Sequence, residues 1–171
     1  MKRIGFLCGT LLIGVMLQAA APNACAQSKG EKQIKAVEEQ IVAAFKARNV
    51  DAIMSYNVPD DSLVIFDATG PRQYVGAKAV RKDLEAFFAM FPGPIVTCEL
   101  SDMTIMTGGT LGVAHYIAHT VMTDKDGKTA DITCRCTDVF RKMHGKWVIV
   151  HSHVSFPVDV ATGKADFSSQ P

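Results

Sequence analysis

The most strongly patterned segment of the chain is CRCTDVFRKMHGKWVIVHSHVSFP, at residues 134–157. It holds two cysteines, one aspartate, the only tryptophan and three of the five histidines of the chain. Side chains of these types serve as metal ligands, nucleophiles and proton-transfer groups. Which chemistry they can perform depends on which of them share a face of the strands that carry them.

Alternation along the strands sorts these side chains into two sets. Which sets share a face depends on the hairpin loops, because two-residue and three-residue loops give opposite answers. We predict three-residue loops at 125–127 and 143–145, because these put the more apolar sets together on one core face. The core face would carry Ala114, Tyr116, Ala118, Ile132, Cys134, Cys136, Phe140, Val148, Val150 and Val154. The other face would carry His115, His119, Arg135, Thr137, Arg141, Trp147, His151 and His153.

The histidines therefore fall on the predicted outer face. Four histidines on one face could bind zinc or another transition metal. Strand spacing, however, puts His115 about 13 Å from His119, which is too far for joint ligands, and His151 about 7 Å from His153. We expect no metal and no other cofactor, and interpret this face as a polar or dimer-forming surface that includes Trp147.

Asp138 is a carboxylate on the predicted core face, between Cys136 and Phe140. A carboxylate in such a place must be hydrogen-bonded, neutralised or exposed in a cavity. Burial raises the pKa of a carboxyl group, and groups with shifted pKa values gather at functional sites. Asp138 is therefore a candidate catalytic residue. The structural alternative is an aspartate near a strand end or beside an arginine, whose hydrogen bonds are all made and which has no catalytic role.

The elements that must position these residues follow from hydrophobic periodicity and turn residues. Two helices come first, then a short strand pair, then a third helix and four long strands. The helices are predicted at 31–49, 50–57 and 76–91, and the strands at 61–67, 73–75, 95–106, 110–122, 130–142 and 146–156. Helices followed by a long antiparallel meander indicate an α+β fold, with one curved sheet wrapped on helices.

From about Glu31 to Pro157 the chain resembles the nuclear transport factor 2-like superfamily, which includes SnoaL-like proteins and ketosteroid isomerases. The stretches YNVPDDSLVIFDATGPRQYVGAKAV, TDVFRK and GKWVIVHSHVS carry the likeness. The last also resembles the end of the calcium/calmodulin-dependent kinase II association domain. The resemblance implies a cone-shaped α+β fold, with about three N-terminal helices on a curved, mostly antiparallel sheet of about six strands. It leaves function open, because this fold carries enzymes, ligand binders and assembly modules.

Ketosteroid isomerases move a proton between carbons with an aspartate base, and they hold the enolate oxygen with a tyrosine and a protonated aspartate. The resemblance places Asp67, at the end of the first strand, where the base stands. It places Asp138, in TDVF, where the protonated aspartate stands. The tyrosine has no counterpart, because residues 42–45 of the first helix contain none. Phe87 or Phe88 stands where the isomerases have another ring with a hydroxyl group.

The predicted site is thus a hydrophobic pocket with two carboxylates suited to proton transfer on a carbonyl compound. We expect isomerase, cyclase or hydratase chemistry, with Asp67 as the base and Asp138 as the acid or hydrogen-bond donor. A non-catalytic ligand-binding or dimerisation module of the same fold is the alternative, and the missing tyrosine favours it. The predicted pocket residues are Tyr56, Phe88, Tyr116, Cys136 and Ser152.

At the N-terminus, Lys2 and Arg3 precede an apolar run, and Ala24-Cys25-Ala26 fits a small-x-small cleavage site. This pattern predicts a secretory signal peptide and a periplasmic or secreted protein. Removal of that segment changes the formal net charge from +1 to −1, because it carries two basic residues and no acidic one. The predicted organisation is a signal peptide at 1–26, one SnoaL-like domain at 27–157 and a flexible tail at 158–171.

The composition also restricts the partners. No basic stripe or tail is present, so nucleic acid is not expected. No second long apolar segment follows the signal peptide, so no membrane association is expected after cleavage. The expected partners are a small hydrophobic or carbonyl-containing molecule and a second copy of the chain, joined through the outer sheet face.

Three cysteines would remain after cleavage, Cys98, Cys134 and Cys136, and an odd number excludes a full disulfide framework. Cys134 and Cys136 point the same way from one strand, which is poor geometry for a bond between them. We interpret all three as small buried residues. A disulfide between Cys98 and one of the other two, in an oxidising compartment, is the alternative.

Overall fold

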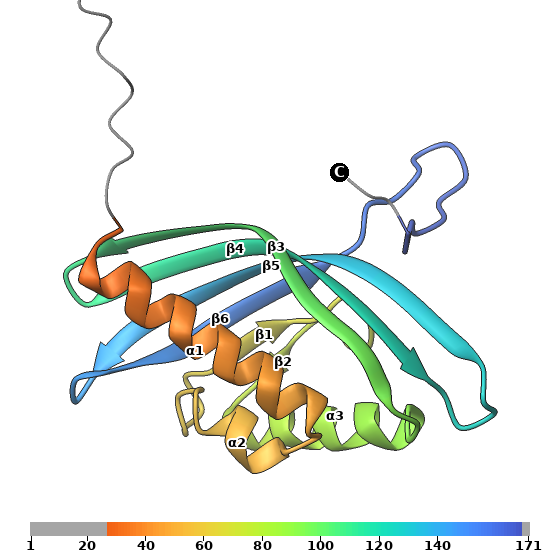
Figure 1. The fold of residues 1–171 in the computed structure, drawn as a ribbon, viewed down its shortest axis with the longest axis horizontal. Helices are drawn as coiled ribbons and strands as arrows, with labels where there is room; N and C mark the ends of the chain where they lie inside the picture. The colour runs from red at the N-terminus through yellow and green to blue at the C-terminus, as the bar shows by residue number, and fades with distance from the viewer. Residues whose placement is uncertain (1–26, 169–171) are drawn as a thin grey trace, which may run out of the picture.

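The computed structural model describes residues 27–168, so the predicted signal peptide at 1–26 lies outside the described residues. The described part contains three helices and six strands (Figure 1). They are α1 (Lys29–Lys46), α2 (Val50–Met54), β1 (Val64–Phe66), β2 (Tyr74–Val75), α3 (Ala77–Met90), β3 (Ile95–Gly108), β4 (Leu111–Thr123), β5 (Thr129–Met143) and β6 (Lys146–Ser155). The predicted α+β fold, with about three helices on a curved and mostly antiparallel sheet, is confirmed.

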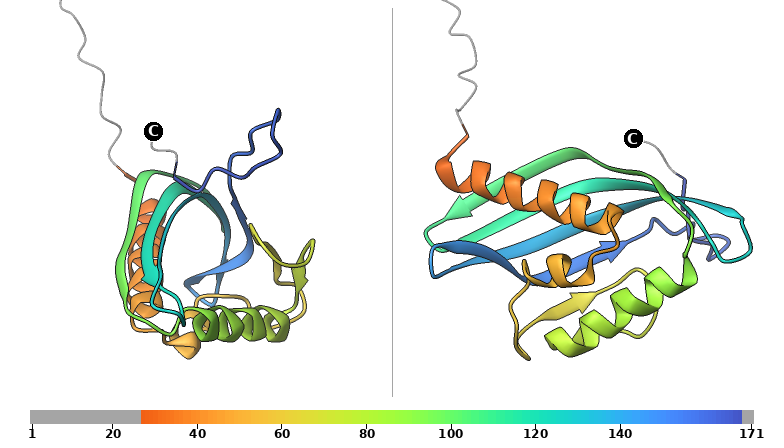
Figure 2. Two further views of the ribbon diagram at one scale, coloured as in Figure 1. Left: turned by 90° about the vertical axis from the view of Figure 1, so that its right-hand side faces the viewer. Right: turned by 60° about the horizontal axis from the view of Figure 1, so that its bottom comes forward.

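The sheet has the strand order β2-β1-β6-β5-β4-β3. Neighbouring strands are antiparallel except β1 and β6, which are parallel. The long strands curve, and α1 lies across their concave side (Figure 2). Below, the side of the sheet that faces α1 is called the inner face, and the opposite side is called the outer face. No helix within residues 27–168 is long and apolar enough to cross a membrane.

The ends of α1 are fixed by local interactions. The Ser28 hydroxyl accepts a hydrogen bond from the Glu31 backbone N–H, and the Glu31 carboxylate accepts one from the Ser28 backbone N–H, which forms a capping box. Arg48 follows the helix in a left-handed conformation, with φ 55°. Its guanidinium donates to the carbonyl oxygens of Phe88 and Phe91, which ties the end of α1 to the end of α3.

The main core lies between α1 and the inner face. Ile34 of α1 is fully buried there. It belongs to one cluster with Ala114, Phe140, Trp147 and Ile149 of the long strands. A second cluster, Ala44, Ile53 and Phe88, joins the three helices.

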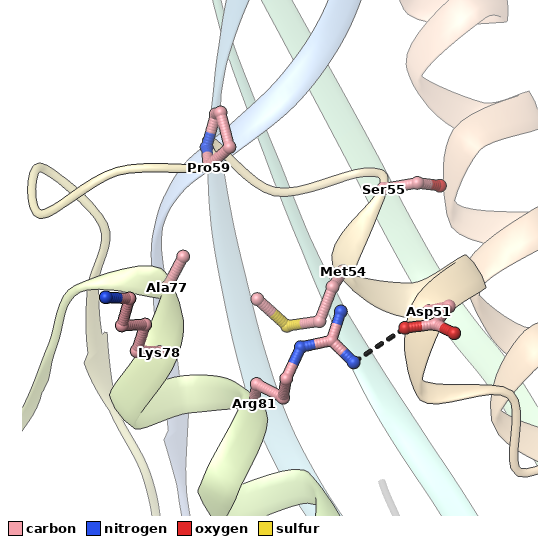
Figure 3. A pocket seen from close by; sticks show the side chains of 7 residues that line it. All are labelled: Asp51, Met54, Ser55, Pro59, Ala77, Lys78 and Arg81. Carbon is pink, nitrogen blue, oxygen red and sulfur yellow. Dashed lines mark hydrogen bonds and ion pairs between the residues drawn. The ribbon is translucent and has the colours of Figure 1, made fainter.

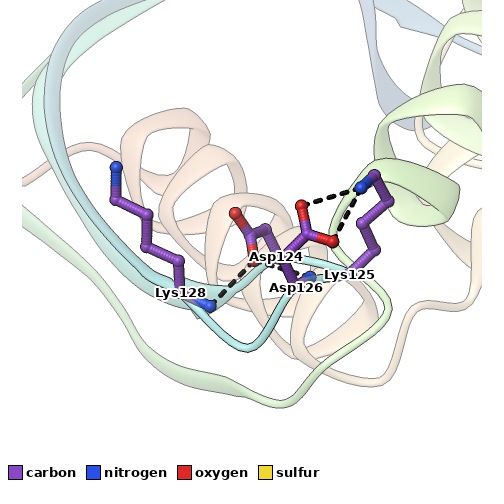
Figure 4. Close-up of polar contacts among 4 residues, drawn as sticks. All are labelled: Asp124, Lys125, Asp126 and Lys128. Atoms are coloured by element: carbon purple, nitrogen blue, oxygen red, sulfur yellow. Dashed lines mark hydrogen bonds and ion pairs between the residues drawn. The ribbon is translucent and has the colours of Figure 1, made fainter.

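The β4–β5 hairpin has the predicted three-residue loop. The Asp124 N–H donates to the Lys128 carbonyl at 2.9 Å, which leaves residues 125–127 as the loop, with Gly127 at φ 79°. The Asp124 carboxylate also accepts hydrogen bonds from the backbone N–H groups of Asp126 and Lys128 (Figure 4). In this register Ala114 pairs with Asp138, Tyr116 with Cys136 and Ala118 with Cys134. The predicted shared face of β4 and β5 is therefore confirmed.

The β5–β6 hairpin differs from the prediction. Met143 pairs with Lys146, so the loop has two residues, His144 and Gly145, with φ values of 49° and 82°. Positive φ at both positions is typical of a type I′ turn, whose twist matches that of the strands it joins. The predicted three-residue loop at 143–145 is therefore wrong.

The shorter loop reverses the first half of β6. Trp147 and Ile149 were predicted on the outer face, but both are core residues, each 5% exposed. Val148, predicted inside, pairs with Arg141 on the outer face. Trp147 is therefore excluded from the predicted dimer-forming surface, and its indole N–H donates to Gln33 of α1.

A β-bulge then restores the predicted assignment of side chains to the two faces in the second half of β6. Phe140 pairs with Ile149 and Val139 pairs with His151, so Val150 is the extra residue between them. Beyond the bulge, Ser152 pairs with Asp138 on the inner face. His151 and His153 alternate with Ser152 and point to the outer face, as predicted.

Residues 158–168, in the segment predicted as a tail, contact the sheet and each other. The Thr133 N–H donates to the Phe167 carbonyl at 2.7 Å. The rings of Phe156 and Phe167 stack edge to face, with centroids 4.7 Å apart. Val158 and Ala165 form an isolated β-bridge.

Candidate functional site

Three oxygen-bearing side chains from three elements meet on the inner face. Tyr116 of β4 donates a hydrogen bond from its hydroxyl to Oδ2 of Asp138 on β5, at 2.6 Å. The same hydroxyl lies 3.4 Å from Oε2 of Glu38, on α1. Glu38 is 1% exposed and Asp138 is 3% exposed. Glu38, Tyr116 and Asp138 are called the carboxyl cluster below.

The fold positions this cluster through the main core. Glu38 follows Ile34 by four residues, about one helical turn, so the packing of Ile34 also directs Glu38 towards the sheet. Ala114 pairs with Asp138, and Tyr116 is the next residue on the same face of β4. On the other side of β5, Ser152 pairs with Asp138, and the hydrogen bond from its side chain favours the ionised form of Asp138.

Burial controls the protonation of the cluster. Burial, with the nearby Asp138 carboxylate, raises the pKa of Glu38 to about 9. Burial also raises the pKa of Asp138, although hydrogen bonds from Ser152, Tyr116 and Glu38 oppose the shift. Burial raises the pKa of Tyr116 as well, so its hydroxyl stays a donor. At neutral pH the cluster therefore keeps a proton on Glu38, beside an Asp138 that accepts hydrogen bonds.

One oxygen of the cluster has no partner among the described residues. Oε1 of Glu38 is buried and makes no hydrogen bond to any of them. An unmade hydrogen bond at a buried polar atom costs free energy, about 1–3 kcal/mol. Because Oε1 has almost no exposed surface, a group of a bound molecule would satisfy it only by displacing the side chains around it.

Asp67 lies directly after β1 and belongs to a second acidic group. Burial raises its pKa, and the Asp83 carboxylate on α3 raises it further. The Ala68 N–H donates to Asp67 at 2.6 Å and opposes the shift. A hydrogen bond with Asp83 raises the pKa of Tyr74 to about 12. Within residues 27–168, no hydrogen bond joins Asp67 to the carboxyl cluster.

The cysteines of β5 lie between the two acidic groups. Asp67 acts electrostatically on the Cys134 thiol, whereas Asp138 and Glu38 act on the Cys136 thiol. Cys98, Cys134 and Cys136 are all free, and the predicted alternative of a disulfide to Cys98 is not formed. A chain of titratable groups therefore runs along the inner face from Asp67 to Glu38.

The inner face is filled at one end and partly exposed at the other. Ala114 and Phe140 are fully buried beneath α1. Beyond Tyr116, the inward side chains of β4 up to Thr120 and of the neighbouring strands are only partly buried, and most are apolar. These residues are called the open half of the inner face: Cys98, Leu100, Ala118, Thr120, Ile132, Cys134 and Val154. An apolar, accessible surface beside buried polar groups is the usual composition of a small-molecule site.

Three of the five predicted pocket residues lie on this inner face with Asp138. They are Tyr116, Cys136 and Ser152. Tyr56 instead donates to Gln40 at 2.6 Å, at an exposed position on the helices. Phe88 belongs to the small core between the helices and contacts the ring of Phe45.

Glu38 is the site residue that the sequence analysis missed. It stands four residues after Ile34 and three before Ile41, so it falls within the apolar stripe of the predicted first helix. A carboxylate among apolar side chains that face the core is also the pattern that identified Asp138 as a candidate on its strand.

A separate pocket of about 330 Å³ lies between α2 and the start of α3 (Figure 3). It contains no residue of the carboxyl cluster, and the guanidinium of Arg81 inside it is paired with Asp51 at 2.7 Å. Its lining residues are Asp51, Met54, Ser55, Pro59, Ala77, Lys78 and Arg81. We base the candidate site on the inner face, where the buried titratable groups gather.

The histidines do not form a metal site in the described part of the chain. No group of three or more His, Cys, Asp and Glu side chains within residues 27–168 is arranged to hold a metal ion. His119 pairs with Asp131 at 2.9 Å, and Nδ1 of His151 lies 2.8 Å from the Val64 carbonyl oxygen. Both histidines thus have local partners.

Comparisons with known proteins place the chain in a family. A model described as the SnoaL-like domain matches residues 34–159. A nuclear transport factor 2-like protein from Pseudomonas putida is 30% identical, with a TM-score of 0.74, and the match covers 83% of this chain and 96% of that one. A search of curated proteins gave no match.

Two more distant structures share the fold. A ketosteroid isomerase-like protein from Erwinia carotovora is 16% identical, covers 75% of this chain and 97% of its own, and has a TM-score of 0.64. A protein from Streptomyces avermitilis, assigned as a dehydratase of the same family, is 16% identical, with coverages of 72% and 93% and a TM-score of 0.63. The chain belongs to the SnoaL-like domain family of the nuclear transport factor 2-like superfamily.

Proposed function

We propose that this protein binds a small, largely apolar molecule on the open half of its inner face and moves a proton on it. The reaction class is that of an isomerase, cyclase or hydratase acting on a carbonyl compound. The observation that carries the proposal is the buried carboxyl cluster, which keeps a proton at neutral pH beside a partly exposed apolar surface.

Asp67 is the proposed base. Its raised pKa makes it a stronger proton acceptor than an ordinary aspartate, while its partial exposure leaves it accessible. It would remove a proton from the carbon next to the carbonyl group. The electron pair of that C–H bond would form a C=C bond, and the π pair of the C=O bond would move to the oxygen to give an enolate. The proton would then return to another carbon of the same molecule.

The carboxyl cluster is the proposed hydrogen-bond donor to the oxygen that becomes negative. The proton of Glu38 can be presented from Oε1, which has no partner among the described residues. Burial and the neighbouring Asp138 keep Glu38 in its protonated form, and the Tyr116 hydroxyl helps to hold Glu38 in position although it favours the ionised form. This assignment gives Glu38 the donor role predicted for Asp138, and it supplies a donor from α1 although that helix lacks the isomerase tyrosine.

The test uses proton exchange, because the natural substrate is not needed for it. Purified protein is mixed with 1-decalone in D2O, and loss of the proton signals next to the carbonyl group is followed by NMR. We expect Asp67→Asn to slow the protein-catalysed exchange by about 100-fold or more. Asp102→Asn is the matched control, since Asp102 is an exposed aspartate on β3.

Equal exchange rates for wild type, Asp67→Asn and Glu38→Gln would contradict the proposed chemistry. Native mass spectrometry of gently purified protein separates this outcome from the alternative function. A bound molecule of a few hundred daltons without any catalysed exchange would favour a non-catalytic ligand-binding module of the same fold.

Export is the second part of the proposal. The basic start, apolar run and Ala24-Cys25-Ala26 site support it. Expression of the full chain in a bacterium should yield a periplasmic protein that begins at Gln27, as judged by fractionation and N-terminal sequencing. An uncleaved protein in the cytoplasm would contradict it.

A further inference from the structure

Two thiols of β5 contact each other on the inner face. Sγ of Cys134 and Sγ of Cys136 lie 3.7 Å apart, within hydrogen-bonding distance for sulfur. The proposed proton transfer uses neither of them. Both side chains leave the strand on the same side, and Cys134 belongs to the open half of the inner face.

The two thiols have different surroundings. Cys136 is buried, and the carboxyl groups of Asp138 and Glu38 lie on its side of the pair. A negative charge on its sulfur is therefore strongly disfavoured, so Cys136 is the hydrogen-bond donor whenever Cys134 has lost its proton. Cys134 is partly exposed, so its thiolate is the one that this pair can form. The hydrogen bond from Cys136 lowers the pKa of the Cys134 thiol, against burial and the repulsion of Asp67.

A third thiol on the same face provides an internal reference. Cys98 of β3 is partly exposed to a similar degree, but its hydrogen-bond donor is the Thr120 hydroxyl and not a thiol. Burial raises its pKa. The charged and titratable groups that act on the Cys98 and Cys134 thiols are Asp67, Cys136, Lys46 and Glu99. The Cys98 and Cys134 thiols also act on each other.

We propose that Cys134 is a nucleophilic site that covalently captures α,β-unsaturated carbonyl compounds on the open half of the inner face. The thiolate is the reactive form of cysteine, and soft carbon electrophiles are its natural reaction partners. The surrounding Leu100, Ala118 and Ile132 would accept the apolar part of such a molecule. The site does not depend on the proposed proton transfer.

The reaction is a simple addition. Sγ of Cys134 forms a bond to the β-carbon, and the π electron pair of the alkene moves to the carbonyl oxygen as an enolate. Water then supplies a proton to the α-carbon, which replaces the proton that the thiol released. The product is a thioether whose mass is the sum of protein and electrophile, and no oxidant or reductant takes part.

The experiment measures labelling rates of the individual cysteines in the folded protein. The reduced domain, residues 27–171, is treated with N-ethylmaleimide or 2-cyclohexen-1-one between about pH 5 and pH 9, and labelled peptides are quantified by mass spectrometry. We expect Cys134 to react about tenfold faster than Cys98 at neutral pH, with the midpoint of its pH profile at lower pH.

Two substitutions test the role of the neighbour. Cys136→Ala removes the hydrogen-bond donor, so the Cys134 profile should shift to higher pH and its rate at low pH should fall severalfold. Cys136→Ser keeps an O–H donor, so the profile should stay near that of the wild type. Circular dichroism confirms that each variant is folded.

Two results would overturn the proposal. One is labelling of Cys98 as fast as, or faster than, Cys134 in the wild-type protein, a comparison that needs no variant. The other is a Cys134 profile that Cys136→Ala leaves unchanged. Preferential labelling of Cys134 that responds to the donor at position 136 supports it.

Discussion

Glu38 and Asp138 are carboxyl groups at positions where the helix and strand patterns would otherwise place apolar side chains. Their burial is tolerated because one proton and the Tyr116 hydroxyl reduce the charge and satisfy most of the oxygens. The same burial gives the site its chemistry, since an ordinary exposed carboxyl group would hold no proton at neutral pH.

Removal of the Tyr116 hydroxyl should destabilise the fold. Tyr116→Phe takes away the 2.6 Å hydrogen bond to Asp138 and leaves a buried carboxyl oxygen without a donor. We expect the free energy of unfolding in urea to fall by about 1–3 kcal/mol. Tyr56→Phe removes a hydroxyl with an equally short but exposed hydrogen bond to Gln40, and should change stability far less. Equal losses of unfolding free energy in the two variants would show that the buried hydrogen bond to Asp138 adds no more stability than the exposed one to Gln40.

The raised pKa of Glu38 also predicts how stability depends on pH. Its pKa rises from 4.5 to about 9 on folding, so between these values the folded protein binds more protons than the unfolded chain. The free energy of unfolding should therefore fall as pH rises through this range. Glu38→Gln is neutral at every pH and should remove this part of the slope.

The measurement is urea denaturation of both proteins at several pH values. Between about pH 5 and pH 8 the wild type should lose on the order of 2 kcal/mol relative to Glu38→Gln. Parallel stability curves for the two proteins would mean that Glu38 titrates alike in the folded and unfolded states.

At the scale of elements, the β5–β6 hairpin decides which side chains of β6 reach the site. The two-residue turn at His144 and Gly145 puts Trp147 in the core, and the bulge at Val150 then returns Ser152 to the inner face beside Asp138. Without the bulge, His151 would point inwards in place of Ser152. The turn and the bulge together therefore determine which side chains of β6 lie in the core and which lie at the site.

The turn should be sensitive to a side chain at its second position. Gly145 has φ 82°, which only glycine adopts without strain, so Gly145→Ala should lower the free energy of unfolding by about 1 kcal/mol. Gly108, at the end of β3, has no positive φ and an added Cβ would contact nothing within 4 Å. Gly108→Ala should thus be close to neutral, and a larger loss there than at Gly145 would contradict the assigned turn.

Much of this organisation is contained in local sequence patterns. Periodicity located the helices and long strands, and the apolar sets of β4 and β5 identified the face of Tyr116, Cys136 and Asp138. The halves of β6 could not be assigned in the same way, because alternation assumes that no residue is inserted. Trp147 and Ile149 form as apolar a set as Val148 and Val150, so hydrophobicity did not distinguish them. Glu38 was not predicted as a site residue, because the face of its helix that packs on the sheet was assigned from the apolar side chains alone.

At the scale of the molecule, the two faces of the sheet have separate roles. Helix α1 covers part of the inner face, whereas none of the described helices lies on the outer face (Figure 2). Outer side chains in the middle of the sheet include partly exposed Val113, Ile117, Val121 and Val139. We propose that this outer face joins two copies of the chain.

The oligomeric state tests that proposal. Light scattering after size exclusion at micromolar concentration should give the mass of a dimer, and Ile117→Asp should give a folded monomer, because a charge at a dimer interface is costly to bury. A monomeric wild-type protein would contradict the proposal, and so would an Ile117→Asp dimer as stable as the wild-type one.

The proposed function depends on a carboxyl cluster that keeps a proton at neutral pH. Carbon-13 NMR of side-chain carboxyl groups measures this directly, with Glu38→Gln and Asp138→Asn to assign the signals. We predict that the Glu38 signal stays at its protonated position through neutral pH and titrates near 9, as its burial beside Asp138 requires. Titration of Glu38 close to 4.5, with both carboxyl groups ionised at neutral pH, would contradict the account.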